Sequence, residues 1–270
     1  MELLFTVDRA YRPVLETCLR SILRFPRDGG YRIYIMHSDL GPEDRAALEA
    51  VCAEKNASLR LVDTDGAMVE DFPVTDRYPR QMYYRLLAAR FLPDTLDRVL
   101  YLDPDIVVIN PLEELWRVDL GGALFGACTH VREFLTRVNQ FRLGAEEGCP
   151  YLNSGVLLMD LAALRREQDP EEIRAYVERF GDRLTLPDQD ILSALYGKRT
   201  KLLDTMRYNL SDRVLAAYNM NPRRQGPMLD VDWVRKNAAV IHYCGRNKPW
   251  KDNYIGVLDV FYREVLDGKG

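Results

Sequence analysis

The sequence predicts an α/β protein with a mostly parallel central sheet and flanking helices. Strand-like and helix-like segments alternate through the N-terminal half, short loops join them, and an apolar run near residue 100 ends in two aspartates. A chain of 270 residues can bury such a sheet within one domain. We expect residues 1–250 to form that domain and residues 251–270 to add a small C-terminal helical tail.

The N-terminal half supplies the parallel part of the sheet. Each strand-like run is apolar, and each helix-like segment repeats apolar residues at helical spacing. Gly41-Pro42-Glu43-Asp44 also has the proline and the acids that are typical of a first helical turn. We expect strands at 3–7, 32–36 and 59–62 and helices at 14–23 and 42–55. Parallel strands with right-handed crossovers follow from that order.

Residues 97–109 are the segment around which the rest of the chain is organised. An apolar, β-favouring run delivers Asp103 and Asp105, and Pro104 between them ends the ladder because proline has no N–H to donate. Both carboxylates then lie at the carboxyl end of a strand, where open α/β sheets bind ligands. Two oxygen donors at this spacing suit Mn²⁺ or Mg²⁺, and the alternative is an ordinary polar turn.

The remaining segments are less regular. We expect further strands at 106–109, 123–128, 151–160 and 238–243, and helices at 81–91, 169–180, 186–197 and 256–266. Residues 129–150 predict a polar loop region, and the breaker-rich residues 219–227 predict a surface loop that could cover a site. Residues 198–235 as a whole show no clear pattern.

Composition excludes several classes of protein. A net charge of −4 gives no general attraction to nucleic acid. Five widely spaced cysteines without a C-x-x-C pair indicate neither a disulfide framework nor a zinc site, and they fit a reducing compartment. No apolar run approaches the roughly 18 residues of a membrane span, and no leader-like segment opens the chain. We expect a cytoplasmic protein, with the inner face of the membrane as an alternative location.

Several short motifs follow one another at predicted strand ends and loops. They are Phe5-Thr6-Val7-Asp8 with Tyr11, Tyr84-Arg85-Leu86, Leu100-Tyr101-Leu102-Asp103-Pro104-Asp105, Asn153-Ser154-Gly155-Val156-Leu157-Leu158, Asp188-Gln189-Asp190, and His242-Tyr243-Cys244-Gly245 with Lys248-Pro249-Trp250. In this order they resemble glycosyltransferase family 8, the retaining nucleotide-sugar enzymes that include bacterial lipopolysaccharide galactosyl- and glucosyltransferases and glycogenin. The resemblance implies a nucleotide-binding GT-A fold and the transfer of a hexose from a UDP-sugar to a glycan or glycolipid acceptor.

The resemblance also implies a metal site. Asp103, Asp105 and His242 would hold Mn²⁺, or Mg²⁺ in its place, which bridges the diphosphate of the donor. On its own, His242 could equally be a core histidine on an apolar strand. Gly245 would let the backbone approach the diphosphate, and Lys248 would neutralise the departing UDP, whereas a surface lysine is the alternative.

The N-terminal strand end would bind the nucleotide. Asp8 would accept a uracil N–H, Thr6 would contribute a backbone group, and Tyr11 would stack on the base. Strand-end aspartates such as Asp8 are also common helix caps. Family members often carry asparagine where this chain has Ala10, so one hydrogen bond to the base or ribose is missing. Arg85 would pair with a phosphate or a sugar hydroxyl, and an arginine on a helix surface is the alternative.

The donor sugar would lie against amides and carboxylates. Asn153, Ser154, Asp188 and Gln189 would bind its hydroxyls, with Gln189 and Asp188 as the catalytic candidates. Turn and helix-cap roles are the alternatives for Asn153 and Asp188. Galactosyl members carry an acid in the loop where this chain has Thr129-His130, and this departure leaves the donor sugar open.

Two other functions compete with transfer. The strand and Asp103-x-Asp105 also match the nucleophile and acid of haloacid-dehalogenase-like phosphatases, although that signature normally opens the domain and here follows several strand–helix units. A sugar-nucleotide-binding module without turnover is the second alternative. The C-terminal helix could contact a membrane peripherally, but Asp259, Arg263 and Glu264 favour packing on the domain.

Overall fold

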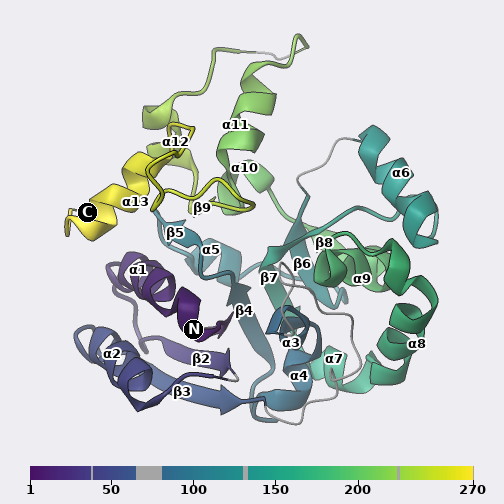
Figure 1. The fold of residues 1–270 in the computed structure, drawn as a ribbon, viewed down its shortest axis with the longest axis horizontal. Helices are drawn as coiled ribbons and strands as arrows, with labels where there is room; N and C mark the ends of the chain where they lie inside the picture. Colours follow the sequence, from purple (N-terminus) through teal and green to yellow (C-terminus); the bar gives the residue numbers. More distant parts are fainter. Residues whose placement is uncertain (38, 65–80, 130–132, 224–225, 270) are drawn as a thin grey trace.

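The structure is a computed structural model that describes residues 1–37, 39–64, 81–129, 133–223 and 226–269. Its main element is a seven-stranded sheet in the order β3-β2-β1-β4-β7-β6-β8 (Figure 1). The strands are β1 (Glu2–Thr6), β2 (Arg32–His37), β3 (Ser58–Asp63), β4 (Arg98–Leu102), β6 (Phe125–Cys128), β7 (Asn153–Asp160) and β8 (Thr200–Leu202). The expected α/β class with a mostly parallel sheet is therefore confirmed.

The first four strands in this order, β3, β2, β1 and β4, pair in parallel, as the alternation of strands and helices along the sequence predicts. Between them run α1 (Arg12–Leu23) and α2 (Pro42–Ala53), which begins with Pro42 after Gly41. Asp44 in its first turn accepts a hydrogen bond from the Gly41 N–H, so the acids serve as the sequence predicts. The parallel half of the sheet thus follows from local patterns.

β7 reverses the direction of the sheet. It pairs antiparallel with both β4 and β6, and Leu102 lies opposite Val156. Consequently the start of β7 meets the end of β4, and the Asp103 N–H donates to the Gly155 carbonyl at 2.8 Å. The polar residues that open β7 therefore share one sheet edge with the aspartates that follow β4.

A second, two-stranded sheet extends this edge. β5 (Ile106–Val108) pairs antiparallel with β9 (Val240–His242), and Ile106 lies opposite His242. Figure 1 shows β5 and β9 beside the helices of the C-terminal third of the chain, which are α10 (Thr205–Tyr208), α11 (Asp212–Asn219), α12 (Val231–Asn237) and α13 (Asp259–Leu266). Apolar side chains of these elements, Phe261 of α13 among them, form one buried cluster.

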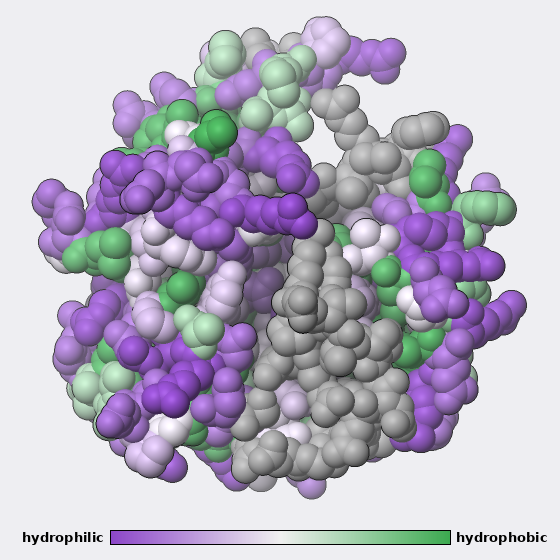
Figure 2. All heavy atoms as spheres, viewed as in Figure 1, coloured by the Kyte–Doolittle hydropathy of each residue, from purple (hydrophilic) through white to green (hydrophobic). Residues whose placement is uncertain are grey.

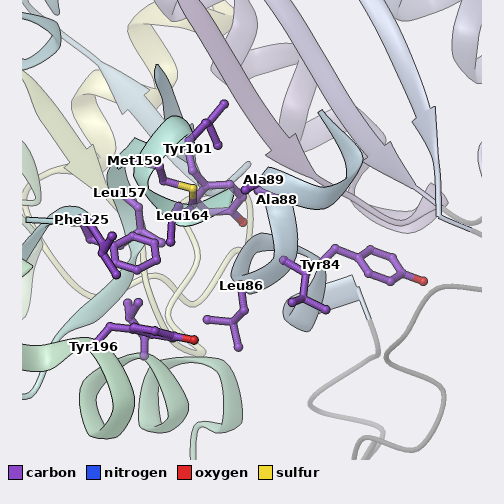
Figure 3. Packing of buried hydrophobic residues seen from close by; sticks show 14 of the residues in the cluster. Tyr84, Leu86, Ala88, Ala89, Tyr101, Phe125, Leu157, Met159, Leu164 and Tyr196 are labelled. Atoms are coloured by element: carbon purple, nitrogen blue, oxygen red, sulfur yellow. The ribbon is translucent and has the colours of Figure 1, made fainter. Parts of the chain in front are cut away.

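Successive side chains along each strand point to opposite faces of the sheet, so the main core is divided between the two faces. Leu3, Phe5 and Leu100 pack with α1 and α2, whereas Leu4 and Tyr101 point to the opposite face. Figure 3 shows that second face, where Tyr101 lies beside Met159 and the cluster continues to Phe125 and Tyr196. The helices that contribute to it are α3 (Gln81–Tyr84), α4 (Ala88–Phe91), α7 (Leu161–Glu167), α8 (Pro170–Phe180) and α9 (Pro187–Tyr196).

Three expectations need correction. Residues 129–150 are not only loop, because Glu133–Leu143 forms α6, whose apolar residues lack a strong helical stripe. The helix expected over 81–91 is interrupted by a 3₁₀ turn at Arg85–Leu87. Residues 198–235 contain β8, α10, α11 and the start of α12, none of which is longer than eight residues, so each gives only a brief periodic signal.

Within the described ranges, no helix is long and apolar enough to span a membrane. On the face drawn in Figure 2, the coloured residues are mostly hydrophilic, with hydrophobic ones scattered in small groups. Another short helix, α5 (Glu113–Trp116), lies between β5 and β6 in the chain.

Candidate active site

The two aspartates after β4 each turn their two oxygens toward different partners. Asp103 Oδ1 accepts hydrogen bonds from Arg85 Nη1 and from the Tyr101 hydroxyl, both at 2.7 Å. Asp105 Oδ2 accepts from Lys248 Nζ, and the Lys248 ammonium also donates to the Tyr243 carbonyl at 3.0 Å. In each carboxylate one oxygen remains directed at the imidazole of His242.

His242 reaches the aspartates through the β5–β9 pairing. His242 stands opposite Ile106, the residue after Asp105, and the Tyr243 N–H donates to the Asp105 carbonyl at 3.0 Å. The imidazole Nε2 lies 3.5 Å from Asp103 Oδ2 and 3.3 Å from Asp105 Oδ1. One ligand atom from each of the three residues lies within 4.8 Å of the others.

Gly155 makes this convergence possible. A Cβ on Gly155 would lie 2.3 Å from His242 Cε1 and 2.6 Å from Asp103 Oδ2, which real Cβ atoms essentially never do. Two carboxylate oxygens and one imidazole nitrogen form a donor set that suits Mn²⁺ and Mg²⁺. The residues present therefore fit the cation that the sequence predicts, and Gly155 provides the space that the ligands need.

The charges of the three groups are strongly coupled. Burial alone would raise the pKa of Asp103, but the Arg85 charge and a hydrogen bond to His242 outweigh it and hold that pKa well below its usual range. Burial likewise opposes protonation of His242, yet the Asp105 charge and the bonds to both carboxylates raise its pKa to about 10. A cation bound between these atoms would replace the Nε2 proton.

Lys248 is a buried residue of the site and not a surface lysine. Its side chain is 8% exposed, and its ammonium lies 6.0 Å from the ring centre of Tyr11 and 5.4 Å from that of Trp250. Burial lowers its pKa, but the Asp105 charge reverses the effect and raises it overall. Gly245, which begins the turn before Lys248, has a φ of +87° that favours glycine. The turn thus carries a cation to the aspartates.

The expected nucleotide residues lie at the end of β1. Asp8 caps the short 3₁₀ helix Arg9–Tyr11 by accepting from the Tyr11 N–H at 2.8 Å, so the capping alternative is realised. Tyr11 is 36% exposed and contacts Trp250 edge-on, with ring centres 6.2 Å apart. The Thr6 hydroxyl bonds the Tyr101 hydroxyl at 2.9 Å, which links β1 to Asp103.

Arg85 joins Asp103, which follows β4, to Asp188 in α9. Besides Asp103, its guanidinium approaches Asp188 Oδ2 at 3.4 Å, donates to the Ser154 carbonyl at 3.2 Å, and stacks on Tyr101 at 4.6 Å. The Ser154 hydroxyl donates to Asp188 at 2.7 Å. Burial raises the pKa of Asp188 more than these partners lower it. Arg85 is therefore a buried bridge and not a helix-surface arginine.

Gln189 and Asp190 have different environments although they are adjacent. Gln189 Oε1 accepts from Asn153 Nδ2 at 3.2 Å. Asp190 is fully buried and accepts from Tyr151, from the Thr185 and Leu186 N–H groups, and from two nitrogens of Arg142 in α6. Because every face of the Asp190 carboxylate is bonded, its role in the structure is to anchor the start of α9.

Two residues of the site were not predicted from the sequence. Tyr101 was expected only as a strand residue, yet its hydroxyl bonds both Thr6 and Asp103. Asn209 is fully buried behind His242 and bonds its Nδ1 atom at 2.8 Å. No local motif marks Asn209, which lies in the segment without a clear pattern. His130 lies outside the described residues.

Comparisons with known proteins identify the family. Residues 2–254 match the model of glycosyl transferase family 8. The chain belongs to glycosyltransferase family 8. This match covers the β4 aspartates, Asp188, Gln189 and His242, so the family assignment rests on the same segments that build the site.

Individual members of the family agree with this assignment. The chain is 28% identical to glycosyltransferase GlyF of Streptococcus pneumoniae over 95% of its own length, and it spans 58% of the length of GlyF. It is 26% identical to lipopolysaccharide 1,2-glucosyltransferase of Escherichia coli K12, over 97% of this chain and 76% of the relative.

Solved structures show the fold of the family 8 chain. An active-site mutant of LgtC superposes with a TM-score of 0.84 at 27% identity, covering 99% of this chain and 96% of that one. Galactosyltransferase LgtC in complex with donor and acceptor sugar analogues gives a TM-score of 0.82 at 26% identity. The expected GT-A type fold is confirmed.

Proposed function

We propose that this family 8 protein is a retaining hexosyltransferase that moves a hexose from a UDP-sugar to a glycan or glycolipid acceptor with the assistance of Mn²⁺ or Mg²⁺. The observation that carries the proposal is the convergence of Asp103, Asp105 and His242 beside Lys248 and Gln189. LgtC, which superposes over the whole chain, was solved with donor and acceptor sugar analogues. Family membership argues against the haloacid-dehalogenase-like phosphatase.

The metal would be held by Asp103, Asp105 and His242. When bound, it would neutralise diphosphate oxygens and so favour the departure of UDP. Lys248 would add a second positive charge on the same side, because its ammonium already lies against Asp105. Tyr11 and Trp250 flank that ammonium and would shield the diphosphate from water.

The nucleotide would bind beside this charge cluster. Tyr11 offers a partly exposed ring for the uracil, and Asp8 keeps one carboxylate oxygen beyond its cap bond for a base N–H. Thr6 would contribute its backbone at the end of β1. Gly245 would bring the backbone of its turn close to the diphosphate, since it has no side chain in the way.

The donor sugar would lie between β7 and α9. Asn153, Ser154 and Asp188 place an amide, a hydroxyl and a carboxylate at this position, and such groups bind sugar hydroxyls. Arg85 would act on the donor by fixing Asp103 and Asp188.

Retention requires either a double displacement or attack by the acceptor on the face from which UDP leaves. Asp190 is a poor candidate for the nucleophile because its carboxylate already accepts five hydrogen bonds and is fully buried. We therefore favour front-face attack, with a diphosphate oxygen taking the acceptor proton. Asn153 turns the Gln189 oxygen toward the sugar side, where its carbonyl dipole would stabilise the oxocarbenium-like charge.

The donor sugar and its acceptor are the finer parts of this proposal. Because Thr129-His130 stands where galactosyl members carry an acid, we expect no strong preference for UDP-galactose over UDP-glucose. A polysaccharide or lipid-linked acceptor at the cytoplasmic face of the membrane fits relatives such as the lipopolysaccharide glucosyltransferase.

A donor screen with Mn²⁺ tests the proposal. The protein is incubated with UDP-glucose, UDP-galactose and other UDP-sugars, and released UDP is measured with and without metal. Metal-dependent release from a UDP-hexose supports transfer; binding without release would indicate a non-catalytic module, and cleavage of a simple phosphomonoester would indicate a phosphatase. A strong galactose preference that persists in His130→Asp would show that this loop does not select the sugar.

A further inference from the structure

Asn209 lies behind the metal-facing side of His242, at the end of α10. It is completely buried, and the chain there is held against β9, because the Leu210 N–H donates to the Val240 carbonyl at 3.1 Å and the His242 N–H donates to the Leu210 carbonyl at 2.7 Å. The amide of Asn209 contacts His242 Nδ1 on one side and Asn153 Oδ1 on the other, each at 2.8 Å. A buried amide in this position connects two parts of the site.

The direction of these hydrogen bonds is fixed by one backbone group. The Gly155 N–H can only donate, and it donates to Asn153 Oδ1 at 3.0 Å. The Asn153 oxygen therefore faces Gly155 and Asn209, so the Asn209 atom that meets it must be the NH₂ group. The Asn209 oxygen then faces His242, and the Nδ1 atom of His242 must carry the hydrogen.

The orientation of the Asn153 and Asn209 amides determines which groups face His242 at one end of the hydrogen-bond chain and Gln189 at the other. At one end, an Nδ1–H tautomer leaves the Nε2 lone pair of His242 pointing between Asp103 and Asp105. At the other end, the NH₂ group of Asn153 is left to donate to Gln189, which turns the Gln189 oxygen inward. A reversed Asn209 amide would turn its NH₂ group toward His242 Nδ1 and its oxygen toward the Asn153 oxygen, so the first result would be lost and the Asn153 orientation that gives the second would be opposed.

We propose that Asn209 is a positioning residue that sets the metal-binding tautomer of His242 and, by donating to the Asn153 oxygen, helps the Gly155 N–H to hold Asn153 in the orientation that directs the Gln189 carbonyl. The inference rests on the proposed function for the roles of the metal and Gln189. Partners that orient a metal-bound histidine typically change metal affinity or activity by about 10- to 100-fold when they are removed. Asn209 adds a link from that histidine to the sugar side.

Two substitutions separate the two ends of the chain of bonds. Asn209→Leu keeps the approximate size but removes both bonds, so we expect metal affinity and transfer each to fall about 10- to 100-fold. Asn209→Asp still accepts from His242 Nδ1 but cannot donate to Asn153. We therefore expect it to retain metal binding while transfer falls about 10- to 100-fold, mainly in kcat.

The hydrogen bond at His242 Nδ1 is observed by ¹H–¹⁵N NMR of the imidazoles with Mg²⁺ and UDP bound, through the chemical shift and the exchange rate of the Nδ1 proton. The chain has three histidines, so the His242 signals can be assigned by substitution. Mn²⁺ affinity is measured by the free Mn²⁺ signal in electron paramagnetic resonance. Asn110→Asp is the matched control. Within the described residues the Asn110 amide donates to the Arg235 and Ala238 carbonyls, so this substitution should leave both readouts unchanged.

The expected result is a downfield, slowly exchanging Nδ1 proton in the wild type and in Asn209→Asp, and an upfield, rapidly exchanging one in Asn209→Leu. A rapidly exchanging Nδ1 proton in the wild type, an unchanged Nδ1 proton in Asn209→Leu, or full transfer by Asn209→Asp would each overturn the inference. If the wild type transfers no hexose but the Nδ1 proton and Mn²⁺ affinity respond as described, the proposed function fails while the positioning role at His242 stands.

Discussion

Gly155→Ala adds one methyl group where the proposed metal site has no room for it. The new Cβ would lie 2.3 Å from His242 Cε1, and ordinary contacts begin near 3.4 Å, so the imidazole would have to retreat by about 1 Å. Asp103 Oδ2, at 2.6 Å from the same position, would also be displaced. Both displaced groups are proposed ligands of one cation.

The size of the effect follows from this geometry. Overpacking of a tight site costs about 1–3 kcal/mol of stability. A displacement of about 1 Å at a reacting centre can cost about 100-fold in rate. We therefore expect Mn²⁺ affinity and UDP-sugar turnover to fall by about that factor, whereas the fold survives.

The assay measures the two consequences separately. Urea unfolding in the presence of EDTA gives the stability cost, and electron paramagnetic resonance of Mn²⁺ gives the affinity. Gly181→Ala is the control, because a Cβ on Gly181 meets nothing within 4 Å. If Gly155→Ala binds Mn²⁺ and UDP as tightly as the wild type, then His242 and Asp103 do not form the cation site together.

Four other substitutions test the remaining assignments. Mn²⁺ and UDP together should protect the wild type against heating, by about 2.7 kcal/mol at ligand concentrations 100 times the dissociation constant. Asp103→Asn should abolish this protection, whereas His242→Ala should only weaken it because the ligand that is lost is neutral. Unchanged protection in Asp103→Asn would contradict the metal site. Gln189→Ala should slow transfer by about 100-fold with UDP affinity nearly intact, and a comparable loss of UDP affinity would place Gln189 in nucleotide binding instead. Arg142→Leu should lower the free energy of unfolding by about 3 kcal/mol because it removes the charged partner of the buried Asp190, and a loss below about 1 kcal/mol by urea titration would show that this pair is not an anchor.

The parallel half of the fold could be predicted because its signals are local. Each strand and helix there shows its own period, and Pro42 marks a helix start. The C-terminal third could not, since α10 and α12 are a few residues long and owe their stability to packing against β5, β9 and α13. The helix α6 was missed because its polar sequence gives no clear apolar face.

The residues of the candidate site likewise include some that local sequence predicts and others that it does not. Asp103 and Asp105 are visible in sequence because a proline ends an apolar strand between them. His242 joins them only through the long-range β5–β9 pairing, which a resemblance can imply but periodicity cannot. Asn209 has no motif at all, and its role depends on where the Gly155 N–H points. Contacts between distant segments are thus what the sequence leaves undetermined.

Arg85 shows how these distant segments depend on one another electrostatically. Asp103 follows β4 and Asp188 opens α9, and both carboxylates are buried next to the same guanidinium. Without that charge the two anions would repel each other in a medium where burial alone raises both of their pKa values. By bonding both, Arg85 keeps one oxygen of Asp103 directed at His242 while Asp188 faces Ser154. A change at Arg85 should therefore disturb both carboxylates at once.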